Sequence, residues 1–401
     1  MKILLVNKFF FLKGGAETVF FQERELLYSA GFEIIDFAMK HEKNLTSSYS
    51  DFFVDNVDYH QGHGISSSLK TAWAFIHNSD ACAKLKTLIE QEKPQVVHFH
   101  NIYHQLTPSL IKVAKSAGCK TVLTAHDTKI ACPSYTMYRQ GKTCEACLDG
   151  SVWNATRYRC QQGSLFKSVL LSLEATYQSL AGNYRALDVI ISPSEFLASI
   201  LRRKLPENHI EVIVNGIDEN VDCSDVSDDG YFLYLGRLSQ EKGIATLAAA
   251  YQQSQRLLPL KVVGDGPLHD TLKQQYSMIE FLGFQSGDAL HQLIKKASAI
   301  VVPSECYENC SMSVLEAMAY GKPVIGANIG GIPEQVREGT EGHLFVAGNS
   351  TSLAEVMDTF AQHPEKAAQL GHNARRRLEQ RYSLTRHQQS LMSLYRNLIN
   401  K

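Results

Sequence analysis

Apolar and polar residues follow two different periods along the chain, and their alternation predicts an α/β protein. Short apolar runs, as in KILLV, PQVVHFH, KTVLTAH and DVIISPS, have the length of buried strands. From 16 to 30, apolar residues instead recur every three or four positions, as on one face of a helix, and Gly31 is a suitable helix stop. Strands that alternate with helices favour a parallel sheet covered on both faces.

The alternation is interrupted once and then begins again. Residues 218–230, DENVDCSDVSDDG, are acidic, polar and without periodicity, as is typical of a linker. Strand-like runs return in YFLYLG, LKVVGDG, IEFLGF, AIVVPS and KPVIGA, and the chain from about 350 onward is mostly helical. Two similar α/β halves joined by a linker predict a cleft between them, with ligands at the carboxyl ends of the strands.

Composition narrows the range of functions. A chain of 401 residues favours two domains, and 40 Lys+Arg against 41 Asp+Glu give no basic excess that would point to a nucleic-acid partner. The start, MKILLVNKFF, reads as a strand rather than a signal peptide, and no apolar run reaches the ~18 residues of a membrane span. Nine cysteines without a secretion signal favour a reducing compartment, so we expect a cytoplasmic protein that can also rest on a membrane surface.

The segment ECYENCSMSVLEAMAYGKPVIG carries two acids, Glu308 and Glu316, separated by seven residues. Glu308 follows a predicted strand, Ser311 is a candidate helix cap, and Gly321 ends the helix that holds Glu316. Free amides at the helix start form an anion site, so the segment suits a phosphorylated sugar whose hydroxyls the two acids accept. The alternative is a loop acid and an ordinary solvated helix glutamate.

Two cations lie in the loop LYLGRLSQEKG. Arg237 and Lys242 together suit a diphosphate, since arginine binds it through two parallel bonds and lysine as a point charge. The alternative is a solvated loop with a local Lys–Glu pair. Gly264, in VVGDGP, allows close approach of the backbone to a ligand or simply forms a turn.

The N-terminal half offers a glycine pair and a histidine. Gly14 and Gly15 follow the first strand, where the missing side chain lets a ligand approach, but no G-x-G-x-x-G fingerprint supports a dinucleotide. His126, in TAHD, ends another strand, where it can hydrogen-bond a substrate or move a proton. A lone histidine is more often structural.

The ordered set GGAE, TAHD, GRLSQEKG, VVGDGP and E-x7-E with LEAMAYGKPVI resembles the retaining GT-B glycosyltransferases of family four, in particular those that build bacterial surface polysaccharides. The resemblance covers nearly the whole chain. It implies an α/β fold of GT-B type, with two Rossmann-like domains facing a central cleft. Residues 1–217 would form the acceptor domain, residues 218–382 the nucleotide-sugar-binding domain, and residues 383–401 a helix that packs back on the first domain.

The resemblance also implies roles for single residues. Arg237 and Lys242 would hold the diphosphate, Glu308 the donor sugar and Glu316 the ribose hydroxyls; Gly15 would approach the phosphate and His126 the sugar. We take Glu308, His126, Arg237 and Lys242 as the catalytic candidates. The candidates for binding the donor are Gly14, Gly15, Gly264, Gly283, Phe284, Asn309, Cys310, Ser311 and Glu316. Many relatives have Gly-Phe-Gly where this chain has Asn309, Cys310 and Ser311, which leaves the identity of the sugar open.

The predicted reaction is transfer, with retained anomeric configuration, from a UDP- or GDP-linked sugar to a glycan or polyprenyl-diphosphate-linked acceptor. Negative charge grows on the leaving diphosphate, where Arg237, Lys242 and the helix amides stabilise it. No D-x-D-type metal loop is present in the sequence, so we expect no need for a catalytic metal. Two alternatives are a non-catalytic GT-B partner subunit and a nucleotide-sugar epimerase of related fold.

Four cysteines, Cys132, Cys144, Cys147 and Cys160, lie within an expected insertion at 130–162. A C-x2-C pair with two flanking cysteines is typical of a structural zinc site, although the flanking spacings of eleven and twelve equally suit four reduced thiols. We expect the insertion to shape the acceptor site. The segments NKFFFLKGG and SLFKSVLLSLEATYQSLAG suit contact with a bilayer or, alternatively, ordinary core packing.

Overall fold

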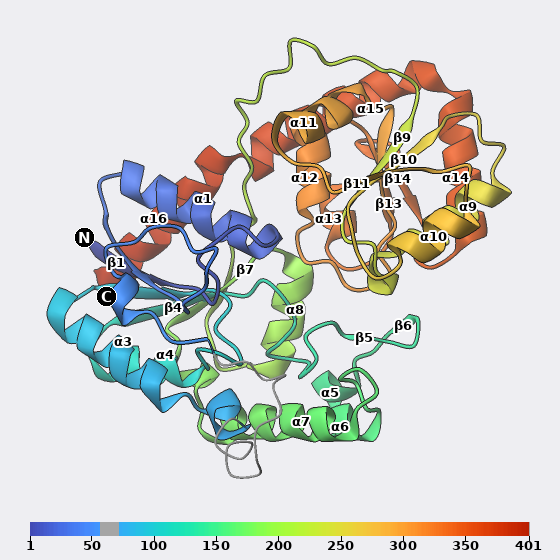
Figure 1. Ribbon diagram of the computed structural model, residues 1–401. Coiled ribbons are helices and arrows are strands. Elements are labelled where there is room, and N and C mark those ends of the chain that lie inside the picture. Colours follow the sequence, from blue (N-terminus) through green and yellow to red (C-terminus); the bar gives the residue numbers. More distant parts are fainter. Residues whose placement is uncertain (57–71, 401) are drawn as a thin grey trace.

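The computed structural model describes residues 1–56 and 72–400, and it contains two α/β domains (Figure 1). The first domain has a parallel sheet of order β2-β1-β3-β4-β7-β8. Its strands are β1 (Lys2–Val6), β2 (Glu33–Phe37), β3 (Val96–Phe99), β4 (Lys120–Thr124), β7 (Val189–Ser192) and β8 (Ile210–Val212). The helices α1 (Gly15–Ser29), α3 (Ser79–Glu92), α4 (Ser109–Ser116), α7 (Leu165–Leu180) and α8 (Glu195–Lys204) belong to the same domain.

The second domain repeats this plan with the sheet order β11-β10-β9-β12-β13-β14. Its strands are β9 (Phe232–Leu235), β10 (Leu260–Val263), β11 (Glu280–Gly283), β12 (Ala299–Val302), β13 (Val324–Ala327) and β14 (Gly342–Phe345). Its helices are α9 (Ile244–Gln253), α10 (His269–Gln275), α11 (Gly287–Lys296), α12 (Met312–Ala319), α13 (Ile332–Gln335), α14 (Ser350–Gln362) and α15 (Pro364–Arg377). The predicted α/β class and the two Rossmann-like domains are confirmed.

Both sheets are covered on both faces, as the unbroken apolar strands require. In β1, Leu4 and Val6 belong to one apolar cluster, while Ile3 and Leu5 belong to the cluster on the opposite face. All four side chains are fully buried. A strand with two buried faces cannot show polar–apolar alternation, which explains why these runs are continuous in the sequence.

In each sheet the strand order reverses at one point. The reversal lies between β9 and β12 in the second sheet and between β1 and β3 in the first. Helices leave such a point in opposite directions, so a crevice opens there at the carboxyl ends of the strands. Loops after these four strands are therefore the places where the fold favours a ligand.

The chain crosses between the domains twice. Residues 218–230 form neither helix nor strand, and the return crossing leads into α16 (Leu384–Ile399). A β-bridge between Ile217 and Ser383 brings the two crossings side by side. Figure 1 shows α16 lying beside α1 on the first domain, where Gln388 donates a hydrogen bond to the Leu26 carbonyl.

The cysteine-rich segment forms a small folded unit that contacts the second domain. It contains the hairpin β5 (Tyr138–Arg139) and β6 (Lys142–Thr143) and the short helices α5 (Ala146–Asp149) and α6 (Asn154–Arg157). Tyr138 donates its hydroxyl to Glu305 (2.6 Å), and Tyr307 donates to Glu145 (2.9 Å). In the part of the chain that the structure describes, no helix combines the length and the apolar character needed to cross a membrane.

Gly371 provides a test of how α12 is positioned. It lies inside α15, where a Cβ would overlap the carbonyl oxygen of Gly321 at the end of α12. Helix propensity alone predicts that Gly371→Ala stabilises the protein, whereas the close packing predicts destabilisation by about 1–3 kcal/mol. The measurement is the midpoint of thermal unfolding. Ala368→Gly, at an exposed site of α15, is the propensity control, and a rise in midpoint for Gly371→Ala would contradict the packing.

Candidate functional site

An ion pair stands at the point where the second sheet reverses. Lys242 follows β9 and Glu308 follows β12, and Lys242 Nζ donates to Glu308 Oε1 at 2.7 Å. Ser304 donates its hydroxyl to the same oxygen at 2.6 Å. We find no hydrogen bond to Glu308 Oε2 from any described residue, so this oxygen can accept one from a ligand.

The pair is held in its charged form. The negative charge of Glu308 is the largest influence on Lys242 and raises the pKa of its ammonium. Burial alone would raise the pKa of the Glu308 carboxyl, but the charge of Lys242 and the hydrogen bonds from Lys242 and Ser304 lower it below its ordinary value. Glu308 is thus an acceptor and not an acid at neutral pH.

Two further cations face each other across the domain boundary. Arg237 is exposed, and its guanidinium has no ion-pair partner among the described side chains. Lys13, in the loop before α1, has a lowered pKa, chiefly because of burial and additionally because of the positive charge of Arg237. The charge of Glu17 opposes this lowering of the Lys13 pKa. Cations drawn from two domains suit an anion between them. Sequence reasoning missed Lys13, although it directly precedes the Gly14–Gly15 pair.

The helix α12 presents part of the predicted anion site. Ser311 is the N-cap residue of this helix, as expected, but its side chain makes no capping bond and its amide donates to Gln335 Oε1 at 2.9 Å. The amides of the next two residues, Met312 and Ser313, have no acceptor among the described residues. They are therefore the free donors at this helix start, one and two positions beyond the predicted one.

Glu316, on the same helix, is an unpaired acid. No described residue forms a hydrogen bond or ion pair with its carboxylate, and burial raises its pKa to about 7. A partly buried carboxyl without a protein partner is costly to keep charged, so hydroxyl donors from a ligand would relieve that cost.

The glycines lie where the chain comes close to itself. A Cβ on Gly15 would approach Met312 Cγ at 3.3 Å, so the first domain meets the start of α12 there. Gly14 caps α1 with extended backbone. A Cβ on Gly264, whose φ is +135°, would overlap the Gly236 carbonyl, so loop packing alone requires this glycine.

The remaining predicted donor-binding residues divide between the loop after β11 and the core. Gly283 ends β11 with φ +68°, and Phe284 beyond it is 75% exposed, a large apolar surface free for stacking. Cys310 does not face a ligand: its side chain is buried in the core of the second domain and contacts Gln335. A contribution of the Cys310 backbone amide to donor binding stays a prediction.

Asn309 joins the two domains. Its amide nitrogen donates to the Ala125 carbonyl at 3.0 Å, and its amide oxygen accepts from Ser194 at 2.7 Å. Glu334 of α13 adds a second link, because its carboxylate accepts the backbone amides of Glu195 and Phe196 at the start of α8. Sequence reasoning missed Glu334 and Ser194, since nothing in either local sequence indicates a partner in the other domain.

His126 lies at the carboxyl end of β4, next to the Ala125 carbonyl that Asn309 binds. Its Nε2 is 2.8 Å from His100 Nδ1. Burial lowers its pKa to about 4, so the imidazole is neutral at physiological pH. It can therefore accept or donate a hydrogen bond but carries no charge.

The four insertion cysteines are free thiols in one region of the first domain. Burial, together with the smaller effect of the neighbouring thiols of Cys132, Cys160 and Cys144, raises the pKa of Cys147 to about 12. Among the described residues, however, no three of these sulfurs lie within 4.8 Å of one another. A tetrathiolate with Zn–S bonds of about 2.3 Å requires closer sulfurs, so zinc here stays a prediction.

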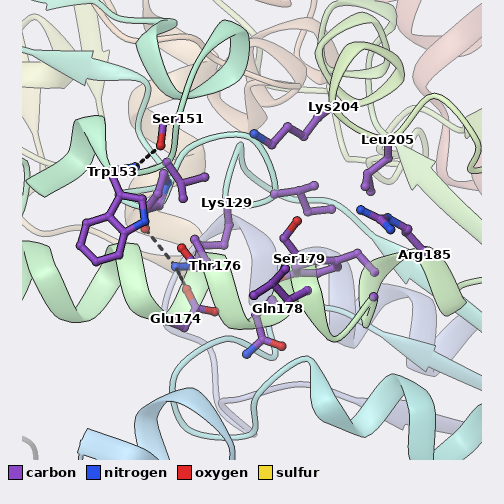
Figure 2. A pocket seen from close by; sticks show the side chains of 17 residues that line it. Lys129, Ser151, Trp153, Glu174, Thr176, Gln178, Ser179, Arg185, Lys204 and Leu205 are labelled. Atoms are coloured by element: carbon purple, nitrogen blue, oxygen red, sulfur yellow. Dashed lines mark hydrogen bonds and ion pairs between the residues drawn. The ribbon is translucent and has the colours of Figure 1, made fainter.

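A separate cavity of about 290 Å³ lies between the insertion, α7 and the end of α8 (Figure 2). Lys129, which lines it, is paired with Glu174 at 2.8 Å and also donates to the Pro133 carbonyl. Because this buried cation already has its counter-charge, the cavity is a weaker candidate for an anionic ligand than the interdomain site of Arg237, Lys242 and Glu308.

Family models match both halves of the chain. The model described as Glycosyltransferase Family 4 matches residues 13–221, slightly more than half of the chain, and the one described as Glycosyl transferases group 1 matches residues 221–377. The chain belongs to glycosyltransferase family 4. The two matches meet inside the irregular segment that joins the domains.

Two curated relatives of this family-4 protein are named as transferases of lipopolysaccharide and O-antigen chains. The lipopolysaccharide 1,2-N-acetylglucosaminetransferase of Salmonella typhimurium is 31% identical over 192 residues, which is 41% of this chain and 50% of that protein. The O-antigen chain mannosyltransferase C of Escherichia coli is 24% identical over 241 residues, 56% of this chain and 64% of that protein. The chain thus spans between half and two thirds of these relatives' lengths.

Solved structures match over the whole length. HepE of Anabaena in complex with UDP-glucose has a TM-score of 0.66 at 19% identity, covering 99% of this chain and 100% of that one. Sucrose-phosphate synthase of Thermosynechococcus elongatus has a TM-score of 0.73 at 19% identity, covering 100% and 99%. At this identity the likeness shows the fold of the family-4 protein alone, which is that of GT-B glycosyltransferases.

The raised pKa of Glu316 predicts a pH-dependent stability. The unfolded carboxyl ionises near its ordinary value of 4.5 and the folded one near 7, so stability falls as pH rises through this window. Glu316→Gln should therefore unfold at a higher temperature than wild type at pH 8 and at nearly the same temperature at pH 4, below both pKa values. Glu355→Gln, exposed on α14, is the control. Equal shifts at both pH values would show that Glu316 has no raised pKa.

Proposed function

We propose that this protein is a retaining glycosyltransferase that moves a sugar from a nucleoside-diphosphate sugar to a glycan or lipid-linked acceptor in surface-polysaccharide biosynthesis. The observation that carries the proposal is the Lys242–Glu308 pair, whose cation and free carboxylate oxygen stand together at the reversal point of the second sheet. A diphosphate and a sugar hydroxyl are the two groups that such a pair can bind side by side. Support also comes from HepE, which was solved with UDP-glucose.

The surrounding groups suit the rest of the donor. Arg237 and Lys13 would share the diphosphate charge with Lys242, and the amides of Met312 and Ser313 would bind its oxygens. Glu316 would accept the ribose hydroxyls, and exposed Phe284 offers a face for the base. The first domain would bring the acceptor, and His126 would face the donor sugar.

Charge development gives the mechanism that we propose. As the bond from the anomeric carbon to the phosphate oxygen breaks, negative charge grows on the diphosphate, close to Lys242, Arg237 and Lys13. The departing phosphate oxygen would take the acceptor's proton on the same face, which retains the anomeric configuration. Because Arg237, Lys242 and Lys13 can neutralise the leaving group, we expect transfer to continue in the presence of a metal chelator.

The two alternatives keep the fold but change the outcome. A partner subunit without turnover would not need the intact Lys242–Glu308 pair or an unpaired Glu316. An epimerase would need a water or base at the sugar but no acceptor. The matches to sugar-transferring relatives from lipopolysaccharide and O-antigen synthesis favour the transferase.

Acceptor delivery at a membrane is part of the proposal. The exposed apolar side chains of α7 include Phe166 (72%) and Leu180 (84%), whereas Glu174 and Gln178 of the same helix are buried. A helix with its apolar side exposed suits contact with a bilayer that carries a lipid-linked acceptor. In the NKFFFLKGG loop, Phe10 is instead buried in the core, so only part of that segment fits the expected contact.

The donor can be identified by ligand-induced stabilisation. We expect one family among UDP, GDP, ADP and their sugars to raise the thermal unfolding midpoint without added metal, because a ligand that binds only the folded state stabilises it. Lys242→Ala and Arg237→Ala should each weaken nucleotide affinity by about tenfold or more. Lys273→Ala, exposed on α10, is the control. No shift with any nucleotide, or full affinity in the Lys242 variant, would contradict the assigned site.

Retention has its own test. Once the donor is known, proton NMR of the first-formed product should show the same anomeric configuration as the donor sugar, because departure and attack share one face. Hydrolysis of the donor serves as the control for spontaneous mutarotation of free sugar. An inverted product would contradict the same-face mechanism while leaving the donor site intact.

A further inference from the structure

A chain of buried polar side chains leads from α1 to His126. Glu23 is 1% exposed and His100 is 2% exposed, and both stand within the first domain among His98, His387 and Tyr395. A carboxylate so deep in a core must have hydrogen-bond donors on both oxygens, or it would be strongly unfavourable. Which neighbours supply those donors decides where each imidazole carries its proton.

His387, on α16, supplies the donor to one oxygen. Its Nδ1 lies 2.7 Å from the Val214 carbonyl, which can only accept, so Nδ1 carries a proton. Its Nε2 lies 3.1 Å from Glu23 Oε1. Burial lowers the pKa of His387, but the hydrogen bond to Glu23 and its charge raise it above the ordinary value. The shared proton therefore lies on His387, and Glu23 is ionised.

His98 Nδ1 lies 3.5 Å from the other oxygen, Glu23 Oε2, but it does not supply the donor. The buried Tyr395 hydroxyl lies 2.6 Å from His98 Nδ1, and we find no other partner for this hydroxyl in the described chain. The tyrosine proton thus points at Nδ1, which makes Nδ1 an acceptor. The proton of His98 is then on Nε2, 2.8 Å from the Thr124 hydroxyl.

His100 remains as the donor. Its Nε2 lies 3.5 Å from Glu23 Oε2, and these two buried atoms are both without a closer partner among the described residues. A proton on His100 Nε2 satisfies both atoms after a small approach. His100 Nδ1 must then accept, and the atom facing it at 2.8 Å, Nε2 of His126, must donate. The proton of neutral His126 is consequently on Nε2, and its Nδ1 is a free lone pair.

We propose that Glu23 fixes, through His100, the tautomer of His126 so that His126 Nδ1 always accepts a hydrogen bond from a sugar hydroxyl. Glu23 and His100 are positioning residues, and naming a sugar as the ligand rests on the proposed function. Burial also keeps His126 neutral, since it lowers the pKa to about 4. A carboxylate in the core thereby determines a hydrogen-bond preference two imidazole rings away.

A metal ion is the competing explanation for the same atoms. Glu23 Oε2, His98 Nδ1 and His100 Nε2 lie within 4.8 Å of one another, a spacing that could hold a metal. Because Tyr395 already donates to His98 Nδ1, an ion would have to displace that hydrogen bond. The hydrogen-bonded chain leaves no such conflict, and the experiment separates the two.

The direct test is NMR of protein labelled with 15N-histidine, with His126→Gln and His100→Gln used for assignment. Long-range proton–nitrogen correlations distinguish the two neutral tautomers. We expect His126 and His100 to carry their protons on Nε2 at pH 7. A proton on His126 Nδ1, or stoichiometric metal in the purified full chain with Glu23→Leu removing it, would overturn the proposal, whether or not the protein binds a nucleotide sugar.

Two variants of Glu23 sharpen the result. Glu23→Gln keeps an acceptor toward His100 while its amide donates to His387, so the His126 tautomer should persist. Glu23→Leu removes the acceptor, so His100 should carry its proton on Nδ1 and His126 should shift toward the Nδ1–H form. Glu25→Leu, exposed on α1, is the matched control. If Glu23→Leu does not fold, wild type and Glu23→Gln still test the proposal. A changed His126 tautomer in Glu23→Gln would contradict the hydrogen-bonded chain from Glu23 through His100 to His126.

Binding provides an independent readout. With the donor identified, Glu23→Leu should weaken affinity for the nucleotide sugar by about tenfold and leave affinity for the nucleoside diphosphate unchanged. A merely structural role would weaken both equally, and that result would overturn the proposal. If no nucleotide sugar binds wild type while the tautomers are as expected, the proposed function fails and the positioning chain stands.

Discussion

The ion pair between Lys242 and Glu308 is the interaction on which the candidate site depends. It joins the loops after β9 and β12, the two strands from which the second sheet continues in opposite directions. The pair places the Lys242 ammonium beside the Glu308 carboxylate, and the hydrogen bond from Ser304 holds that carboxylate in one orientation. The amides of Glu305 and Cys306 also donate to the Glu241 carbonyl, so backbone hydrogen bonds hold the two loops together beside the ion pair.

Contacts between the domains bring the other groups to this pair. Asn309 binds Ala125 and Ser194, and Glu334 binds the start of α8, so the loops after β4 and β12 are held together. The helix α16 ties the first domain to the second from the opposite side and buries His387 against Glu23. The candidate donor-binding groups and His126 are thus brought together by polar contacts between the domains, to which the ring contact of Phe196 and Tyr307 adds.

The sequence predicted the fold well because it depends on local patterns. Buried strands are continuous apolar runs in the sequence. Glycines such as Gly321 end helices because glycine readily adopts a positive φ, which is a local property of the segment. Lys242 and Glu308 were each site candidates from the sequence, since both follow strands, but their ion pair was not predicted. What the sequence could not predict are contacts between segments far apart in the chain. Lys13 near Arg237 and Glu334 at the start of α8 are contacts between the domains, and Gln335 with the Ser311 amide is one within the second domain. The proton direction in the Glu23–His100–His126 chain likewise depends on three distant segments.

The most direct test of the account is a crystal structure of the full chain with the nucleoside diphosphate that stabilises it. The account predicts the diphosphate within hydrogen-bond distance of Lys242 Nζ and Arg237, with the ribose hydroxyls on Glu316. Glu308 Oε2 would then be the acceptor nearest to the position of the sugar. A nucleotide bound elsewhere, for example in the cavity beside Lys129 and Glu174 (Figure 2), would contradict it.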